Sequence, residues 1–261
     1  MLKSCILFQF FTKMFDAALL LGDSQTQLGW GEGGWVTSLA EKYVRKVDII
    51  NRGLSGYNTR MLLNVLPDIL NSVALENVKM VTLMMGSNDA SFPETNPEQA
   101  VPLEEFGENL LKIISMLFNK GIKKESIVIM SPPPILPEKW TQYRNSLPGP
   151  KYENCKDNQL TKQYAAECGK VAGRMNITFV DLFTAMMGLH DLDAALSDGL
   201  HLGKPGHSVL VKHLSTIFDE KLGSSRAENL MLPEWREMTN SSLQQCGQDY
   251  SQWKKDNPDR L

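Results

Sequence analysis

The sequence lacks an excess of either charge. Its 261 residues carry 27 Lys and Arg against 30 Asp and Glu, which gives a formal net charge of -3 at pH 7. A chain with this balance has no overall positive field to attract a phosphate backbone or an anionic lipid surface. We therefore expect no nucleic-acid partner. The content of 42% hydrophobic and 22% charged residues excludes a mainly disordered chain.

Cysteine is scarce, and its spacing is irregular. The four thiols are Cys5, Cys155, Cys168 and Cys246, without a Cys-x-x-Cys pair. This spacing fits neither a zinc framework nor a disulfide scaffold, so we interpret all four as reduced thiols. The sequence also lacks a His-Glu-x-x-His motif, a paired His/Cys cluster and an EF-hand loop, and we expect no metal and no cofactor.

Long apolar runs are missing as well. The longest, such as Ala17–Leu21 and Val81–Met85, fall far short of the roughly 18 residues that a membrane span needs. Residues 1–14 hold a short apolar stretch between two lysines, but Gln9 interrupts it and no small-residue cleavage site follows. We expect a soluble protein without membrane insertion, in which residues 1–14 form an irregular N-terminal extension.

Short apolar runs instead alternate with longer amphipathic segments. This pattern is typical of βαβ units around a parallel sheet that is buried on both faces, and it predicts one α/β domain over residues 15–222. We expect strands at Ala17–Leu21, Val47–Asn51, Val78–Met85, Ser126–Met130 and Ile177–Asp181.

Three helices are expected between and after these strands. Apolar side chains at three- and four-residue steps from Leu103 to Leu117 indicate one helix, which Gly121 ends. A second should cover about 159–175, and a last one should begin near Pro205, since proline suits a first helical turn.

Two stretches show no such periodicity. Residues 131–158 begin with a proline-rich run and continue as polar sequence, so we expect one long loop that lines a pocket. Residues 223–261 are polar and are expected to form a C-terminal tail outside the domain.

The first candidate for chemistry is Ser24 in the segment LLLGDSQTQ. It directly follows an apolar strand, and Gly22 permits a sharp turn before a helix. A serine in such a turn projects its hydroxyl from the carboxyl edge of the sheet, where a helix N-terminus favours developing negative charge. The alternative, which this segment alone leaves open, is that Asp23 and Ser24 only cap a helix.

A serine nucleophile needs a base, and the sequence has four histidines. His201 lies in SDGLHLGKPGH, three residues after Asp198, in a turn that contains two glycines. Such a turn can bring carboxylate and imidazole together, so that Asp198 fixes the ring tautomer and His201 accepts the serine proton. His190, His207 and His213 have no comparable setting, and we interpret them as structural.

Acyl transfer also needs donors that face a developing oxyanion. The segment NRGLSGYNT offers the backbone N–H of Gly53 or Gly56, and GSND offers the side-chain amide of Asn88. Asp89 is expected to make local turn hydrogen bonds instead. All these candidates follow a predicted strand or lie beyond the last one. Ligands of open parallel sheets bind at that edge, so the candidates indicate one site.

The order GDS, SGYNT, GSND and DGLH resembles the SGNH or GDSL-type hydrolase superfamily over nearly all of residues 17–220. More narrowly, the chain resembles the isoamyl acetate-hydrolysing esterase family, an intracellular branch that acts on small esters. The resemblance implies a three-layer α/β/α, flavodoxin-like fold with a five-stranded parallel sheet in the order 2-1-3-4-5. It also implies a cytoplasmic location.

Carried over position by position, the resemblance implies a role for each candidate. The catalytic residues would be Ser24, Asp198 and His201, and the oxyanion hole would be formed by Ser24, Gly56 and Asn88. Gln25 departs from the family pattern, which usually has an aliphatic residue after the serine. That departure leaves open how polar the pocket is beside Ser24.

Together these features predict a serine esterase that hydrolyses carboxylic esters of short acyl groups through an acyl-enzyme intermediate. The expected partner is a small-molecule ester, bound in a small closed pocket. Two alternatives stay open: an acyltransferase in which an alcohol replaces water, and a non-catalytic binding protein on the same fold. The sequence also leaves the choice between a monomer and a homodimer open.

Overall fold

The computed structural model describes residues 15–222, 251–252 and 255–256. Within them, five parallel strands form one sheet in the order β2-β1-β3-β4-β5. They are β1 (Asp16–Gly22), β2 (Val47–Gly53), β3 (Val78–Met84), β4 (Ile127–Met130) and β5 (Thr178–Val180). The five predicted strands and the implied strand order are confirmed.

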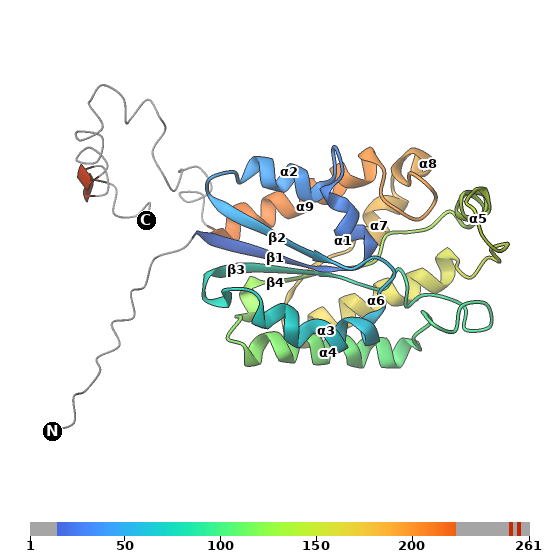
Figure 1. Ribbon diagram of the computed structural model, residues 1–261, viewed down its shortest axis with the longest axis horizontal. Coiled ribbons are helices and arrows are strands. Elements are labelled where there is room, and N and C mark those ends of the chain that lie inside the picture. The colour runs from blue at the N-terminus through green and yellow to red at the C-terminus, as the bar shows by residue number, and fades with distance from the viewer. Residues whose placement is uncertain (1–14, 223–250, 253–254, 257–261) are drawn as a thin grey trace.

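Helices cover both faces of this sheet (Figure 1). One face carries α3 (Thr59–Asn71), α4 (Leu103–Asn119) and α6 (Asn158–Met175), and the other carries α2 (Trp35–Lys42), α7 (Leu182–Met187) and α9 (Lys204–Leu222). Shorter elements are α1 (Ser24–Gln27), α8 (Leu192–Ala195) and the 3-10 helices η1 (Leu28–Trp30), η2 (Leu75–Asn77) and η3 (Lys124–Ser126). The three helices that the sequence predicted are α4, α6 and α9.

Strand β1 shows why the apolar runs are nearly continuous. Leu19 and Leu21 belong to the core under α3, α4 and α6, whereas Ala18 and Leu20 belong to the core under α2 and α9. All four side chains are fully buried. Because neighbouring residues of a strand point to opposite faces, a sheet covered on both faces needs apolar residues at every position.

The stretch 131–158 is not the single long loop that we predicted. It contains α5 (Pro137–Ser146), which begins at a proline and buries only one side chain, Trp140. One apolar residue draws no stripe along a helix, so hydrophobic periodicity could not reveal this element.

The sequence also led to expectations about membrane-spanning helices, cysteines and the two ends of the chain. In the described part of the chain, no helix is long and apolar enough to cross a membrane. Cys155 and Cys168 are buried free thiols, as predicted, whereas Cys5 and Cys246 lie outside the described residues. The predicted extension at 1–14 and nearly all of the predicted tail at 223–261 lie outside them too. The domain bounds therefore stay a prediction.

Candidate active site

Ser24 is the first residue of α1, directly after the turn that ends β1. A Cβ on Gly22 would lie 2.7 Å from the carbonyl oxygen of Met84, so only glycine allows this close passage between β1 and β3. Asp23 caps α1 by accepting the backbone N–H of Gln25 at 2.9 Å. The capping interpretation thus accounts for Asp23 but not for the hydroxyl of Ser24.

His201 joins Ser24 to Asp198. Its Nε2 lies 3.0 Å from Ser24 Oγ, and its Nδ1 lies 2.6 Å from Asp198 Oδ2. The other carboxylate oxygen accepts the backbone N–H groups of Leu200 and His201 at 2.9 and 2.8 Å. Burial raises the pKa of Asp198, but the hydrogen bonds from His201 and the backbone outweigh it, and the pKa falls below its ordinary value. Asp198 is therefore ionised at neutral pH and can hold the imidazole in one orientation.

The turn between Asp198 and His201 depends on Gly199. Its φ of +94° lies in the left-handed region that favours glycine. A Cβ at this position would lie 2.5 Å from the backbone nitrogen of Trp140, so glycine also lets α5 pack directly on the turn. The backbone N–H of Leu136 donates to the carbonyl oxygen of Gly199 at 2.8 Å and fixes this contact.

Gly56 and Asn88 line the same cavity as Ser24. Asn88 donates one N–H of its side-chain amide to the carbonyl oxygen of Tyr57 at 2.8 Å, which leaves its second N–H for a ligand. Gln99 fixes both residues, because its Nε2 donates to the carbonyl oxygen of Gly56 at 2.8 Å and to Asn88 Oδ1 at 3.3 Å. The sequence offered no sign of Gln99, which lies in a polar stretch without a motif.

Gly53, the alternative to Gly56, has a different role. Its backbone N–H donates to Asn51 Oδ1 at 2.8 Å. A Cβ on Gly53 would lie 2.1 Å from the backbone nitrogen of Gln27. Gly53 therefore lets the end of β2 pack against α1, and its N–H is already bonded, so Gly53 is excluded as an oxyanion donor.

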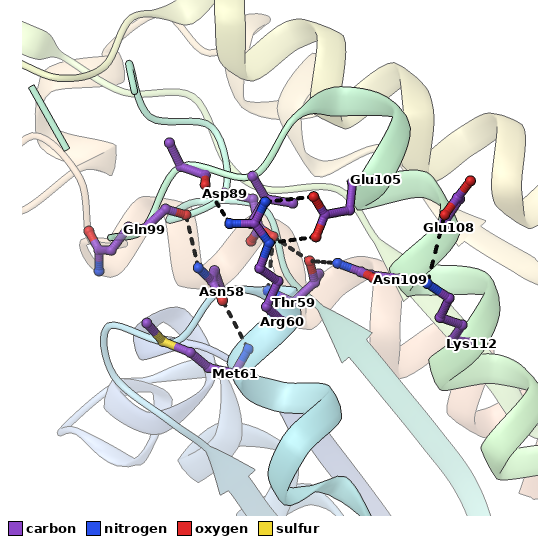
Figure 2. Close-up of polar contacts among 12 residues, drawn as sticks. Asn58, Thr59, Arg60, Met61, Asp89, Gln99, Glu105, Glu108, Asn109 and Lys112 are labelled. Atoms are coloured by element: carbon purple, nitrogen blue, oxygen red, sulfur yellow. Dashed lines mark hydrogen bonds and ion pairs between the residues drawn. The ribbon is translucent and has the colours of Figure 1, made fainter. Parts of the chain in front are cut away.

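Asp89 does not make the local turn hydrogen bonds that we predicted for its side chain. Its Oδ1 accepts the backbone N–H of Thr59 at 2.8 Å and the Thr59 hydroxyl at 2.5 Å, at the start of α3. Asn109 of α4 donates to the same hydroxyl at 3.1 Å (Figure 2). Burial raises the pKa of Asp89 to about 6. The prediction was wrong because the partner lies 30 positions away in sequence.

Gln25 resolves the question that its departure from the family pattern raised. Its side chain is 1% exposed and is not part of the cavity lining. Its Nε2 donates to the carbonyl oxygen of Leu200 at 2.8 Å, and its Oε1 accepts the backbone N–H of Leu202 at 3.2 Å. Because these two residues flank His201, the amide of Gln25 ties the turn of His201 to the helix of Ser24 and adds no polarity to the pocket.

Lys156 is a buried cation at the cavity that sequence reasoning missed. It is 3% exposed, and its Nζ donates to the carbonyl oxygen of Ser87 and to the hydroxyl of Ser91, both at 2.6 Å. These two residues stand on either side of Asn88, so Lys156 holds the turn that presents the amide. Burial lowers the pKa of Lys156 to about 8, and burial raises the pKa of the nearby Asp23 to about 6.

The other three histidines do not line the cavity. His190 and His213 are exposed. His207, near the start of α9, is half-buried, and burial lowers its pKa. The structure therefore brings only His201 of the four histidines to Ser24, and the structural interpretation of the others stays a prediction.

The cavity around Ser24 has a volume of about 710 Å³. Its walls come from the turns at 55–56 and 88–99, from α5 and from residues 147–156. Sites of about 300 to 1,000 Å³ hold drug-sized ligands, so this cavity is larger than the small closed pocket that we predicted. The stretch 131–158 lines this cavity, as predicted, although part of it is the helix α5.

The chain is similar to known proteins over most of its length. Residues 20–209 match the model of the GDSL-like Lipase/Acylhydrolase family. The chain is 38% identical over 230 residues to the isoamyl acetate-hydrolyzing esterase 1 homolog of Rattus norvegicus, a match that covers 86% of this chain and 89% of that protein. It is 35% identical over 229 residues to the Homo sapiens protein of the same name, with the same shares of the two chains.

Solved structures show a similar fold. A lipase/acylhydrolase from Enterococcus faecalis superposes with a TM-score of 0.59 at 22% identity, over 79% of this chain and 96% of that one. The acetyl xylan esterase AlAXEase superposes with a TM-score of 0.60 at 19% identity, over 77% of this chain and 98% of that one.

Proposed function

We propose a mechanism from one premise: the chain belongs to the GDSL-like lipase/acylhydrolase family and is a carboxylic ester hydrolase. Our proposal is that Ser24 attacks the ester carbonyl and that His201 and Asp198 activate it. The observation that carries the proposal is the pair of contacts at 3.0 Å from Ser24 Oγ to His201 Nε2 and at 2.6 Å from His201 Nδ1 to Asp198.

The reaction then takes two steps. As Ser24 Oγ bonds to the carbonyl carbon, its proton passes to His201 Nε2, and the tetrahedral intermediate collapses when that proton moves to the leaving alcohol oxygen. An acyl-enzyme on Ser24 remains. Water then attacks the acyl carbon and gives a proton to His201, which passes it to Ser24 Oγ as the bond to Ser24 breaks and the carboxylic acid leaves. Ionised Asp198 stabilises the imidazolium that forms twice in the cycle.

The oxyanion of each intermediate would be stabilised by three donors. These are the backbone N–H groups of Ser24 and Gly56 and the second N–H of the Asn88 amide. The support for Asn88 is its fixed orientation, since one N–H is bonded to Tyr57 and the amide oxygen accepts from Gln99. A donor held in this way needs no reorganisation when negative charge develops.

We therefore expect Asn88→Ala to lower kcat by roughly 10² to 10³ with little change in KM, because the donor acts mainly on the transition state. Steady-state kinetics with p-nitrophenyl acetate would measure both constants. Thr95→Ala is the matched control, since Thr95 lines the same cavity but has no part in the proposed machinery. A rise in KM alone would instead make Asn88 a contact of the ground-state substrate.

The acyl group is proposed to be short, as the names of the animal relatives suggest for those proteins. Each acyl CH₂ that is buried contributes about 0.8 kcal/mol until the chain meets the end of its site. We expect p-nitrophenyl acetate to butyrate to be good substrates and the palmitate to be negligible, measured as kcat/KM below aggregation concentrations. Comparable values for acetate and palmitate would contradict a short acyl site.

Other expectations stay predictions. A cytoplasmic location and the choice between monomer and homodimer are not tested by this arrangement. The same holds for the expected absence of a cofactor. Within the described ranges, no group of three or more His, Cys, Asp or Glu side chains is placed to hold a metal ion.

A further inference from the structure

The proposed mechanism determines which side of the cavity receives the alcohol part of the ester, and this inference rests on that mechanism. The leaving oxygen takes its proton from His201 Nε2, so the alcohol part must lie beside the imidazole. The elements next to the imidazole on the cavity side are α5 and residues 147–156. These residues line a cavity whose whole volume is about 710 Å³, within the range that holds drug-sized ligands.

Two aromatic side chains, Trp140 and Tyr152, form the wall next to His201. The ring of Trp140 lies edge-on to the imidazole, with the centroids 5.6 Å apart and the planes at 81°. Tyr152 packs on Trp140 at 6.2 Å and accepts a hydrogen bond of 3.0 Å from its indole N–H. Trp140 is only 7% exposed. This aromatic wall is therefore anchored in the domain and fixed relative to the reacting atoms.

Arg144 lies over both rings of the aromatic wall. Its Cζ is 5.6 Å from the centroid of Trp140 and 5.3 Å from that of Tyr152. A contact of this kind orients a guanidinium through its face and leaves the N–H groups at its edge for other partners. Across residues 15–222, 251–252 and 255–256, no ion pair joins Arg144 to a carboxylate. Arg144 is exposed, so the two ring contacts hold its guanidinium at the cavity that it lines, with no ion-pair partner in this part of the chain.

The charges around this cation are mostly of the same sign. Lys151 and the buried Lys156 line the same cavity, and Glu153 is the carboxylate among the lining residues. The charge of Lys156 faces Asp23 and Asp89, and its Nζ is bonded to Ser87 and Ser91. Arg144 and Lys151 are therefore the cations left to attract an anion in this cavity. A planar guanidinium binds carboxylate and phosphate oxygens in pairs, which an ammonium does not.

We propose that the aromatic wall and Arg144 form a subsite for the alcohol part of the substrate, and that this part carries an anionic group, a carboxylate or a phosphate. The ring or chain of the alcohol packs on Trp140 and Tyr152, and the anion binds the edge of the guanidinium. The imidazole of His201 and Cζ of Arg144 each lie 5.6 Å from the Trp140 centroid, and we place the anion several bonds from the ester oxygen.

Matched acetate esters test this proposal with the full chain. The probes are 4-acetoxybenzoate and 3-(4-acetoxyphenyl)propanoate, each compared with its neutral primary amide. In the unmodified protein at low salt, at least one of the two carboxylate esters should have a kcat/KM about three- to tenfold higher than the matching ester with the neutral amide. Arg144→Gln should bring that ratio close to the value set by chemical reactivity alone, and Arg144→Glu should reverse the preference. The preference should also weaken as salt is added.

Lys151→Gln is the matched control, because Lys151 lines the same cavity from an exposed position without contacting the aromatic wall in the contacts described above. It should change the ratio less than Arg144→Gln does. Equal ratios in the unmodified protein and in Arg144→Gln would overturn the proposal. The esterase assignment would still be supported if the acetate esters that carry the neutral amide group were hydrolysed. The proposal would also be overturned if Arg144→Gln no longer hydrolysed the acetate esters that carry the neutral amide group. If no ester were hydrolysed by the unmodified protein, the proposed function itself would fail.

Discussion

Ser24→Ala is expected to abolish ester hydrolysis and labelling by an organophosphonate, with kcat falling by at least about 10³. The change removes one oxygen, whose partner is His201 Nε2 at 3.0 Å. The side chain is only 6% exposed and belongs to a four-residue helix whose cap is Asp23, so the fold should be retained. Hydrolysis, mass spectrometry of the labelled protein and thermal unfolding measure these three results.

Two outcomes would remove this assignment. Full labelling of Ser24→Ala would place the reactive nucleophile elsewhere in the chain. An unmodified protein that takes up no phosphonate and hydrolyses no ester would favour the non-catalytic binding protein. Ser55→Ala is the matched control, since Ser55 lines the same cavity and should be labelled and active like the unmodified protein after this change.

His201→Ala should be nearly as severe as Ser24→Ala. In the proposed mechanism the imidazole takes the serine proton, and residues that act as a unit lose their effect together. The double variant should therefore be scarcely slower than either single one. Steady-state rates on p-nitrophenyl acetate would measure all three.

His207→Ala and His213→Ala provide the controls for this experiment. Both residues lie on α9 and neither lines the cavity, so both variants should keep most of the activity. If His207→Ala were inactive and stably folded while His201→Ala stayed active, the segment DGLH would be the wrong motif.

The sheet could be predicted from the sequence because its signal is local and strong. Residues Ala17–Leu21 of β1 are all buried on one face or the other, so this part of the strand is a continuous apolar run. Helix α5 could not be predicted from the sequence, because nothing local distinguishes it from a polar loop. What holds it is the burial of Trp140 and a close packing on Gly199, which lies 59 positions away.

The candidate site divides in the same way. Ser24, Asn88 and His201 could be found because each residue type performs a recognisable reaction step and each follows a strand or a glycine-containing turn. The residues that hold these three in place could not be predicted, since their hydrogen-bond partners are distant in sequence. Asp89 bonds Thr59 across 30 positions, and Lys156 bonds Ser87 across 69. No pattern of spacing predicts a contact of that kind.

Gln25 links the two ends of the domain in a way that also sets when activity can arise during folding. Its bonds to Leu200 and Leu202 join positions 175 and 177 residues apart. Contacts between residues so far apart in sequence cost loop-closure entropy, so they form only as the intervening elements dock. During synthesis, β1 and Ser24 leave the ribosome long before the turn that carries His201. If His201 is the base, as proposed, a nascent or partly folded chain exposes Ser24 without it, and the first turnover reports that the whole topology has formed.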